Sequence, residues 1–240
     1  MASQGAGFSA SLRAAESIRD VLLARPREGG WSGPDDDGVI ADVRTLGLVG
    51  PPGTGKSTVA GILADILPMS GIAVAGEAPM DGFHLSNTVL EELDLRDRKG
   101  APETFDVDGY GALLRRLQEV SRGGDEIAEG RVVYAPGYRR DLHEPVAAMH
   151  PIAAKGLVIT EGNYLGLDDL AWRAVRTEVD MLVYLDAPRD ELLRRLVERH
   201  VAFGKDRQEA AHWVRTVDAA NIELVESAKT AADMVVIVEV

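Results

Sequence analysis

Runs of apolar, often β-branched residues alternate with stretches of helical apolar spacing along most of this chain. The apolar runs predict buried strands at residues 44–49, 71–81, 156–162, 180–188 and 232–240. Helical spacing predicts helices at residues 8–25, 56–67, 107–122, 189–202 and 208–228. Strands that alternate with helices in this way predict an α/β sandwich of three layers around a mainly parallel sheet.

Some segments interrupt this alternation and indicate how the chain is organised. Pro26 and the segment "REGGWSGPDDDG" break the first helical pattern, so residues 1–40 are expected to form an N-terminal helix and a mobile connector. The main domain is expected to cover residues 41–240. Within it, "EIAEGRVVYAPGYRRDLHEP" (126–145) predicts a short strand and an irregular loop. Pro68 is expected to end the helix that begins at residue 56.

The segment "GPPGTGKS", residues 50–57, matches the pattern G-x-x-x-x-G-K-[ST] between a predicted strand and a predicted helix. Its glycines let successive backbone N–H groups converge on an anion, and the following helix adds its own unpaired N–H groups. Lys56 would bring a charge to the β- and γ-phosphates, and Ser57 would coordinate Mg²⁺. An ordinary glycine-rich turn is the alternative. The residues expected to hold the nucleotide are Gly50, Pro51, Pro52, Gly53, Thr54, Gly55, Lys56, Ser57 and Thr58.

Signatures of other nucleotide-dependent proteins are absent from the sequence. There is neither an N-K-x-D guanine signature, usual in GTPases, nor an L-S-G-G-Q-like segment, which transporter ATPases carry. The rest of the chain must therefore indicate an acceptor for the phosphate.

Three carboxylates follow predicted strands, at the edge where open parallel sheets bind their ligands. Asp81 ends the second predicted strand in "PMDGFHLSN" and could accept the proton of an attacking hydroxyl. Glu161 ends the strand in "GLVITEG" and could hold Mg²⁺ through a water or orient an acceptor. Asp186, in "VYLDAP", is less specific because Asp-x-Pro is an ordinary strand exit. The structural alternatives are an Asp-Gly turn for Asp81 and a strand-end cap for Glu161.

The helix predicted at 189–202 carries two arginines away from its apolar face. Arg195 and Arg199 are one turn apart, and Glu191 precedes them by a turn. Like charges repel unless an anion lies nearby, so we interpret this helix as a lid whose arginines close over a phosphoryl group. A solvated face of Glu–Arg pairs is the alternative. The basic, glycine-interrupted segment 199–207 suits the mobile end of such a lid, and Arg195 is also expected to contact the nucleotide.

Two single polar residues are further candidates. Asn221 lies on the apolar stripe of the helix at 208–228, where it needs a hydrogen-bond partner that is either structural or a substrate. His84 follows Asp81 by three residues, in the expected acceptor pocket. The other four histidines have weaker claims. No histidine spacing indicates a metal site made by protein ligands, so the metal expected is the Mg²⁺ that arrives with the nucleotide.

Composition changes this picture mainly by exclusion. Of the 240 residues, 45% are hydrophobic, enough for one substantial core. No apolar run approaches the ~18 residues that span a bilayer. The absence of cysteine excludes disulfides and thiolate sites, and the formal net charge of −13 argues against a general nucleic-acid surface. Since no secretory signal is visible, the protein is expected to be cytoplasmic, with neither nucleic acid nor membrane as a partner.

Several segments, in this order, resemble those of one family: "GPPGTGKST", "MDGFHLSN", "RKGAPETFDVDGYGALLRRL", "YAPGYRR", "VITEGNYL", "YLDAP" and "RLVERHVAFG". From about residue 44 to the C-terminus the chain resembles the phosphoribulokinase/uridine kinase family of P-loop kinases. The likeness is closest to its branch of pantothenate kinases and bacterial nucleoside- or fructokinase-like proteins. The resemblance implies a P-loop fold with a helical lid.

The resemblance also implies roles for individual residues. Lys56 and Ser57 would serve the phosphates of ATP and Mg²⁺. Asp81 would lie beside the acceptor hydroxyl, and Glu161 would be the acidic residue after the central strand. Arg199 would be the lid arginine that contacts phosphates. The residues implied for the acceptor pocket are Asp81, Phe83, His84, Lys99, Tyr138 and, near an asparagine that pantothenate kinases use, Asn221.

These observations together predict an ATP- and Mg²⁺-dependent kinase that phosphorylates a hydroxyl of a small polar metabolite, with acceptor-binding loops at about 82–152. The acceptor would be pantothenate-, nucleoside- or sugar-like. Pantothenate kinases are usually longer and richer in aromatic residues, and uridine kinases differ around "DGFHL", so neither substrate transfers directly. The alternative is a nucleotide-dependent switch or chaperone-like ATPase that acts on a protein. Relatives often form dimers, so a homodimer is also considered.

Overall fold

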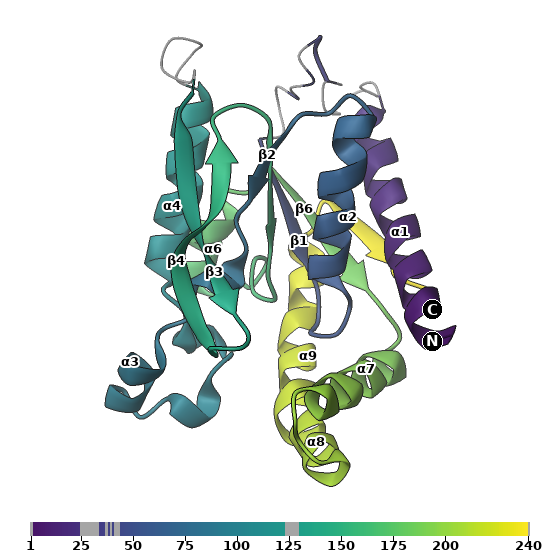
Figure 1. Cartoon of the computed structure of the whole chain (residues 1–240), viewed down its shortest axis with the longest axis vertical. Helices are drawn as coiled ribbons and strands as arrows, with labels where there is room; N and C mark the ends of the chain where they lie inside the picture. The colour runs from purple at the N-terminus through teal and green to yellow at the C-terminus, as the bar shows by residue number, and fades with distance from the viewer. Residues whose placement is uncertain are drawn as a thin grey trace.

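The computed structural model describes residues 2–24, 34–36, 38, 40, 44–122 and 130–239. Its centre is a five-stranded sheet in the order β2-β5-β1-β6-β7, and every pair of neighbouring strands is parallel. The strands are β1 (Thr45–Val49), β2 (Val74–Glu77), β5 (Leu157–Glu161), β6 (Met181–Asp186) and β7 (Met234–Ile237). Helices cover both faces (Figure 1), so the predicted α/β fold with a mainly parallel sheet is confirmed.

The three inner strands are buried along almost their whole length, which explains their continuous apolar sequences. One face packs against α1 (Ala2–Leu23) and α2 (Lys56–Met69), and the other against α4 (Val107–Arg122) and α6 (Leu170–Arg176). In β1, for example, Leu46 and Leu48 pack on the face with α1 and α2, while Val49 packs on the face with α4 and α6. The sheet therefore divides the interior into two hydrophobic cores.

The N-terminal helix is an integral part of the first core. Buried side chains of α1, among them Ile18 and Leu22, pack with those of α2 and of the sheet. The two helices run side by side in Figure 1. Most of the connector predicted up to residue 40 lies outside the described residues, and the predicted division at residue 40 stays a prediction.

The described part of the segment predicted as a short strand and an irregular loop, residues 130–145, belongs to a two-stranded hairpin with a shift in register between Ala135 and Gly137. β3 (Val132–Arg139) pairs antiparallel with β4 (Glu144–Ala153). The sequence of β4 has two prolines and no clear alternation of apolar and polar residues, because most of its side chains are at least partly exposed. The hairpin packs beside β2, where a Cβ on Gly76 would lie 2.8 Å from the carbonyl oxygen of Pro151. The predicted short strand is therefore confirmed as β3, whereas β4, which follows the turn at residues 140–143, was not predicted.

The other differences concern the ends of predicted elements and several short elements. Pro68 lies inside the last turn of α2, which continues to Met69, and does not end the helix. Asp81 follows β2 within the 3₁₀ turn η1 (Met80–Phe83), and is not at the strand end. Further short elements were not predicted: α3 (Asn87–Glu92), η2 (Arg96–Arg98), η3 (Pro102–Thr104) and η5 (Ser227–Ala231).

The two helices predicted near the C-terminus are present. They are α7 (Arg189–Ala202) and a longer helical segment made of α8 (Arg207–Trp213), the π-helical turn η4 (Val214–Asp218) and α9 (Ala219–Glu226). Figure 1 shows α7 and α8 at one end of the sheet, on the opposite side from α3. In the described part of the chain, the helices are too short or too polar to cross a membrane.

Candidate active site

The glycine-rich loop after β1 is held tightly between β6 and α7. Gly53 and Gly55 have φ angles of 89° and 91°, in the left-handed region that favours glycine. A Cβ on Gly50 would lie 2.3 Å from the carbonyl oxygen of Leu185, and one on Gly53 would lie 3.3 Å from that of Leu192. The buried Thr54 hydroxyl donates to the carbonyl oxygen of Pro51 at 2.8 Å. The loop is therefore preformed, and α2 begins directly behind it.

Lys56 lies at the N-terminal end of α2, with its ammonium group turned back into the loop. Its Nζ donates to the carbonyl oxygens of Gly50 at 2.9 Å and Pro51 at 3.0 Å. Burial lowers the pKa of Lys56 to about 8, although the carboxylates of Glu161 and Asp81 act in the opposite direction. A buried cation with two carboxylates nearby forms the floor of the site.

Ser57 and Glu161 meet directly beneath the loop. The Ser57 hydroxyl donates to Oε1 of Glu161 at 2.8 Å. Burial raises the pKa of Glu161, and the negative charge of Asp81 raises it further, while Lys56 opposes both. A hydroxyl and a carboxylate oxygen side by side are ligands of the kind that a hard divalent cation prefers.

A cavity of about 960 Å³ extends from the loop to the hairpin and to the helices α7, α8 and α9. Most of the residues predicted for the site line it: Pro52, Gly53, Gly55, Lys56, Ser57, Thr58, Asp81, His84, Lys99, Tyr138, Glu161, Arg195, Arg199 and Asn221. Gly50, Pro51 and Thr54 lie behind the loop surface and are not part of the lining. Phe83 also lies outside it, because its ring packs on Tyr110 with 4.8 Å between centroids.

His84 forms one wall of the cavity opposite the loop. Its ring stacks between those of Phe105 and Tyr138, at centroid distances of 4.1 Å and 4.9 Å. Its Nδ1 is 2.8 Å from the carbonyl oxygen of Asp81, so the histidine and the aspartate are held in a fixed relation. Burial lowers the pKa of His84, which favours the neutral ring.

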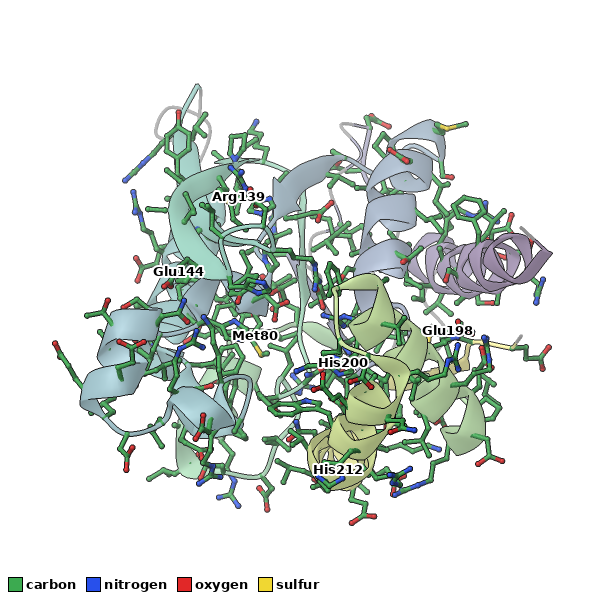
Figure 2. The ribbon with its side chains drawn as sticks, turned by 60° about the horizontal axis from the view of Figure 1, so that its bottom comes forward. Met80, Arg139, Glu144, Glu198, His200 and His212 are labelled. Carbon is green, nitrogen blue, oxygen red and sulfur yellow. The ribbon has the colours of Figure 1, made fainter. Side chains whose placement is uncertain are left out.

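Lys99 joins the loop after α3 to the hairpin. Its Nζ donates to Oδ1 of Asn87 and to the carbonyl oxygen of His143, both at 2.6 Å, and lies 5.3 Å from the centre of the Tyr138 ring. The backbone N–H of Asn87 in turn donates to the carboxylate of Glu144. Figure 2 shows Glu144 on the hairpin, at the side that faces α3. These contacts close the cavity on the side away from the glycine-rich loop.

The two arginines predicted for the lid lie on α7. Arg195 donates to Glu191 at 2.7 Å and to the carbonyl oxygen of Gly53 at 3.3 Å, which attaches α7 to the loop. Its Nη2 is buried and has no hydrogen-bond partner among the described residues. Burial lowers the pKa of Arg199, and the nearby charge of Arg140 lowers it further. Both guanidinium groups thus have unused capacity to bind an anion.

The model of the phosphoribulokinase/uridine kinase family matches residues 45–239. The chain belongs to this family. An uncharacterized protein of Escherichia coli, YggC, is 38% identical over 79% of this chain and 75% of its own length. A "putative uridine kinase" of Schizosaccharomyces pombe is 32% identical over 79% of this chain and 81% of its own. A "putative fructose transport system kinase" from Silicibacter has a TM-score of 0.72 at 30% identity, over 93% of this chain and 98% of that one.

In this P-loop kinase the nucleotide end of the cavity fits ATP. The left-handed glycines of the loop, the Lys56 ammonium group and the unpartnered Nη2 of Arg195 together offer backbone and side-chain donors to phosphate oxygens. The Ser57 hydroxyl and the Glu161 carboxylate fit a divalent cation that is also held by phosphates. Among the described residues, no cluster of three or more acidic, histidine or cysteine side chains could hold a metal alone.

Several residues of the kinase cavity were not predicted from the sequence. Arg140 lies one residue past the end of β3 and follows Tyr138 by two positions, and this spacing was the available signal. Asp218 precedes Asn221 by three residues on the same helical face, and His200 contacts it at 2.8 Å between Nε2 and Oδ2. Burial raises the pKa of Asp218, and the hydrogen bond from His200 opposes this shift. Figure 2 shows His200 on the inner side of α7 and Glu198 farther out.

Some of the remaining candidates line the cavity and others do not. The carboxylate of Asp186 accepts a hydrogen bond from Lys229 at 2.7 Å and is not part of the cavity lining. Of the other histidines, His143 lines the cavity, whereas His150 and His212 do not. Asn221 lines the cavity from α9, so its side chain is available to a ligand.

Proposed function

We propose that this protein is an ATP- and Mg²⁺-dependent kinase that transfers the γ-phosphoryl group to a hydroxyl of a small polar metabolite. One observation carries the proposal. The phosphate-binding loop, the carboxylate of Asp81 and the guanidinium of Arg199 line a single cavity, and Asp81 influences the pKa of both Lys56 and Arg199. A base, a phosphate site and a cation on the opposite wall are the parts that phosphoryl transfer needs.

Each group has a distinct task in the proposed reaction. Asp81 orients the acceptor hydroxyl and takes its proton as the oxygen attacks the γ-phosphorus. The new P–O bond forms while the bond from the γ-phosphorus to the bridging oxygen breaks, and that oxygen leaves with its electron pair as part of ADP. Lys56 and Arg199 stabilise the negative charge spread over the transferring group.

Mg²⁺ would be held by Ser57 and, through a water, by Glu161. When bound with ATP, it neutralises charge on the β- and γ-phosphate oxygens. The raised pKa of Glu161 reflects its burial beside Asp81, and a divalent cation at this point would offset the repulsion between the two carboxylates.

The acceptor is expected to bind between the hairpin and the helices α8 and α9. His84, Lys99 and Tyr138 line this part from one side and Asn221 from the other. The names of the relatives, which include uridine kinase and pantothenate kinase, support a small metabolite as the acceptor class.

A coupled ADP-release assay tests the proposal with pantothenate, nucleosides, ketoses and sugar alcohols as acceptors. We expect one class to stimulate ADP release and Asp81→Asn to lower kcat at least ~100-fold with that acceptor, since a general base contributes about 10²–10⁴-fold. The affinity for ATP should stay within about twofold. Near-normal turnover by Asp81→Asn would refute the role given to Asp81. ATP hydrolysis that no acceptor stimulates, but that a protein partner does, would favour the switch or chaperone-like ATPase.

A further inference from the structure

The cavity has a charge opposite to that of the whole protein. The chain has 26 Lys and Arg against 39 Asp and Glu. The cavity lining instead has seven cationic side chains, Lys56, Arg96, Lys99, Arg140, Arg195, Arg199 and Lys205, and four acidic ones, Asp81, Asp97, Glu161 and Asp218. An excess of positive charge inside an acidic protein indicates that the ligands of this cavity are anions.

The nucleotide accounts for only part of this positive charge. Lys56 and Arg195 are joined to the glycine-rich loop by hydrogen bonds, and Arg199 lies one turn beyond Arg195 on the same lid helix. Lys205, at the end of the lid, stacks on the ring of Trp213 at 4.8 Å. Arg96, Lys99 and Arg140 come from the other side, from the segment after α3 and from the hairpin. These three cations line the side of the cavity where the acceptor is expected to bind.

Arg140 is the most informative of the three because its guanidinium makes no hydrogen bond or ion pair with any described residue. Both Arg140 and the preceding residue, Arg139, are exposed, but Arg139 binds Asp141 through two hydrogen bonds of 2.8 Å and 2.6 Å and does not line the cavity. The charge of Arg140 also acts on Arg199. It lowers the pKa of Arg199 and is, after burial, the second-largest cause of that shift. Since both guanidinium groups line the cavity, an anion bound beside them would relieve the repulsion between their charges.

Lys99 has a similar unused charge. Its two hydrogen-bond partners, Asn87 Oδ1 and the carbonyl oxygen of His143, are neutral. Glu144 is near enough to oppose the burial that lowers the pKa of Lys99, but its carboxylate oxygens accept the backbone N–H of Asn87. Arg96 has a weak contact with Glu91, at 3.7 Å. Lys99 can therefore offer its remaining N–H to a ligand that also contacts Arg140.

We propose that the acceptor is itself an anion, with a carboxylate or phosphate group bound by Arg140 and Lys99 while its hydroxyl faces Asp81. This inference rests on the proposed kinase function and narrows it to hydroxylated acids or phosphorylated polyols, as opposed to uncharged nucleosides, sugars or sugar alcohols. An arginine fork matches the two oxygens of either anion, and Lys99 adds a point charge beside it.

Matched pairs of acceptors test the inference in the ADP-release assay. Pantothenate and D-glycerate are compared with their neutral counterparts panthenol and glycerol, fructose 6-phosphate is compared with fructose, and uridine is added as a neutral nucleoside. We expect the charged member of at least one pair to have a kcat/KM about 10- to 100-fold above that of its neutral counterpart, the range of a charge-assisted hydrogen bond. Which pair responds distinguishes a carboxylate from a phosphate.

Variants of the two neighbouring arginines then test whether Arg140 causes the preference for the charged acceptor. Arg140→Met should lower kcat/KM for the charged acceptor about 10-fold or more, mainly through a higher KM. It should thereby reduce the advantage of the charged acceptor over its neutral counterpart. Arg140→Lys should restore part of that advantage. Arg139→Met is the matched control and should leave that advantage unchanged. The inference is overturned if neutral acceptors are used as well as charged ones, or if Arg140→Met affects both members of a pair equally. If no acceptor of either kind stimulates ADP release, the proposed kinase function fails as well.

Discussion

Lys56 carries its charge at a position where burial opposes ionisation. In the folded protein its pKa falls to about 8, from about 10.5 for a free lysine side chain. The folded state therefore binds fewer protons than the unfolded chain between these two values. Lys56 destabilises the fold below pH 8, and this cost is lost as the pH rises from 8 to 10.5. The residue is retained at some expense in stability, which is typical of a group that serves a ligand.

The same pKa predicts how nucleotide binding depends on pH. In the proposed function ATP binds the ammonium form of Lys56, so binding above pH 8 should be accompanied by proton uptake, and affinity should fall about 10-fold for each further pH unit. Isothermal titration calorimetry with a non-hydrolysable ATP analogue from pH 7 to 9.5 measures this slope. Lys56→Met should bind the ATP analogue weakly and without the inflection near pH 8. It should also lower kcat, because roughly 2–4 kcal/mol of transition-state stabilisation would be lost. An unchanged inflection in this variant would assign it to another group.

The 3₁₀ turn that carries Asp81 depends on a close approach between two elements. Gly82 packs against β3, and a Cβ at this position would lie 2.3 Å from the carbonyl oxygen of Pro136 and 2.5 Å from its carbonyl carbon. Backbone atoms cannot move aside as a flexible side chain can. The contact between η1 and the hairpin therefore fixes Asp81 and His84 relative to the acceptor side of the cavity.

Gly82→Ala should accordingly lower the free energy of unfolding by about 1–3 kcal/mol, the usual cost of overpacking, and lower kcat because Asp81 is displaced. Gly61→Ala in α2 is the matched control, since nothing lies within 4 Å of a Cβ there. That substitution should be neutral or stabilise the protein by up to about 1 kcal/mol. Urea unfolding and the ADP-release assay measure both variants. Equal stability of the two would mean that η1 adapts and does not fix the site.

The same elements explain what could and could not be predicted from the sequence. β1, β5 and β6 were predictable because burial on both faces requires continuous apolar residues, and the phosphate loop because its geometry requires particular glycines. β4 was missed because an exposed strand needs no such pattern. Arg140 and Asp218 line the same cavity only through tertiary structure, because the hairpin and the helical segment α8–η4–α9 come together from distant parts of the chain. Local spacing places each of them beside another candidate, Tyr138 or Asn221, but does not show that the two elements meet around one cavity.

At the scale of the whole molecule, the core extends beyond the part that the family model matches. That part begins at residue 45, yet α1 contributes fully buried side chains to the core beside α2. A Cβ on Gly55 of the phosphate loop would lie 3.4 Å from the Ser11 hydroxyl of α1. The N-terminal helix therefore supports the loop from behind and is part of the folded unit that binds phosphate.

Ile18→Ala in α1 should lower the free energy of unfolding by about 2–4 kcal/mol, because it leaves a cavity at a fully buried position. Phe8→Ala, at a residue on the same helix that is 56% exposed, should cost less than about 1 kcal/mol. Urea unfolding monitored by far-UV circular dichroism would measure both. If α1 were a detachable appendage, the two substitutions would have equally small effects on the main transition.

The opposite charges of the cavity and of the whole protein also have a kinetic consequence. At low ionic strength a net charge of −13 repels an approaching anion at long range, and the positive cavity attracts it only at short range. At about 0.1 M salt the Debye length is about 10 Å, so the distant repulsion is screened while the attraction inside the cavity is largely kept. The association of ATP should therefore be slower in dilute buffer than at moderate salt, the reverse of ordinary electrostatic steering.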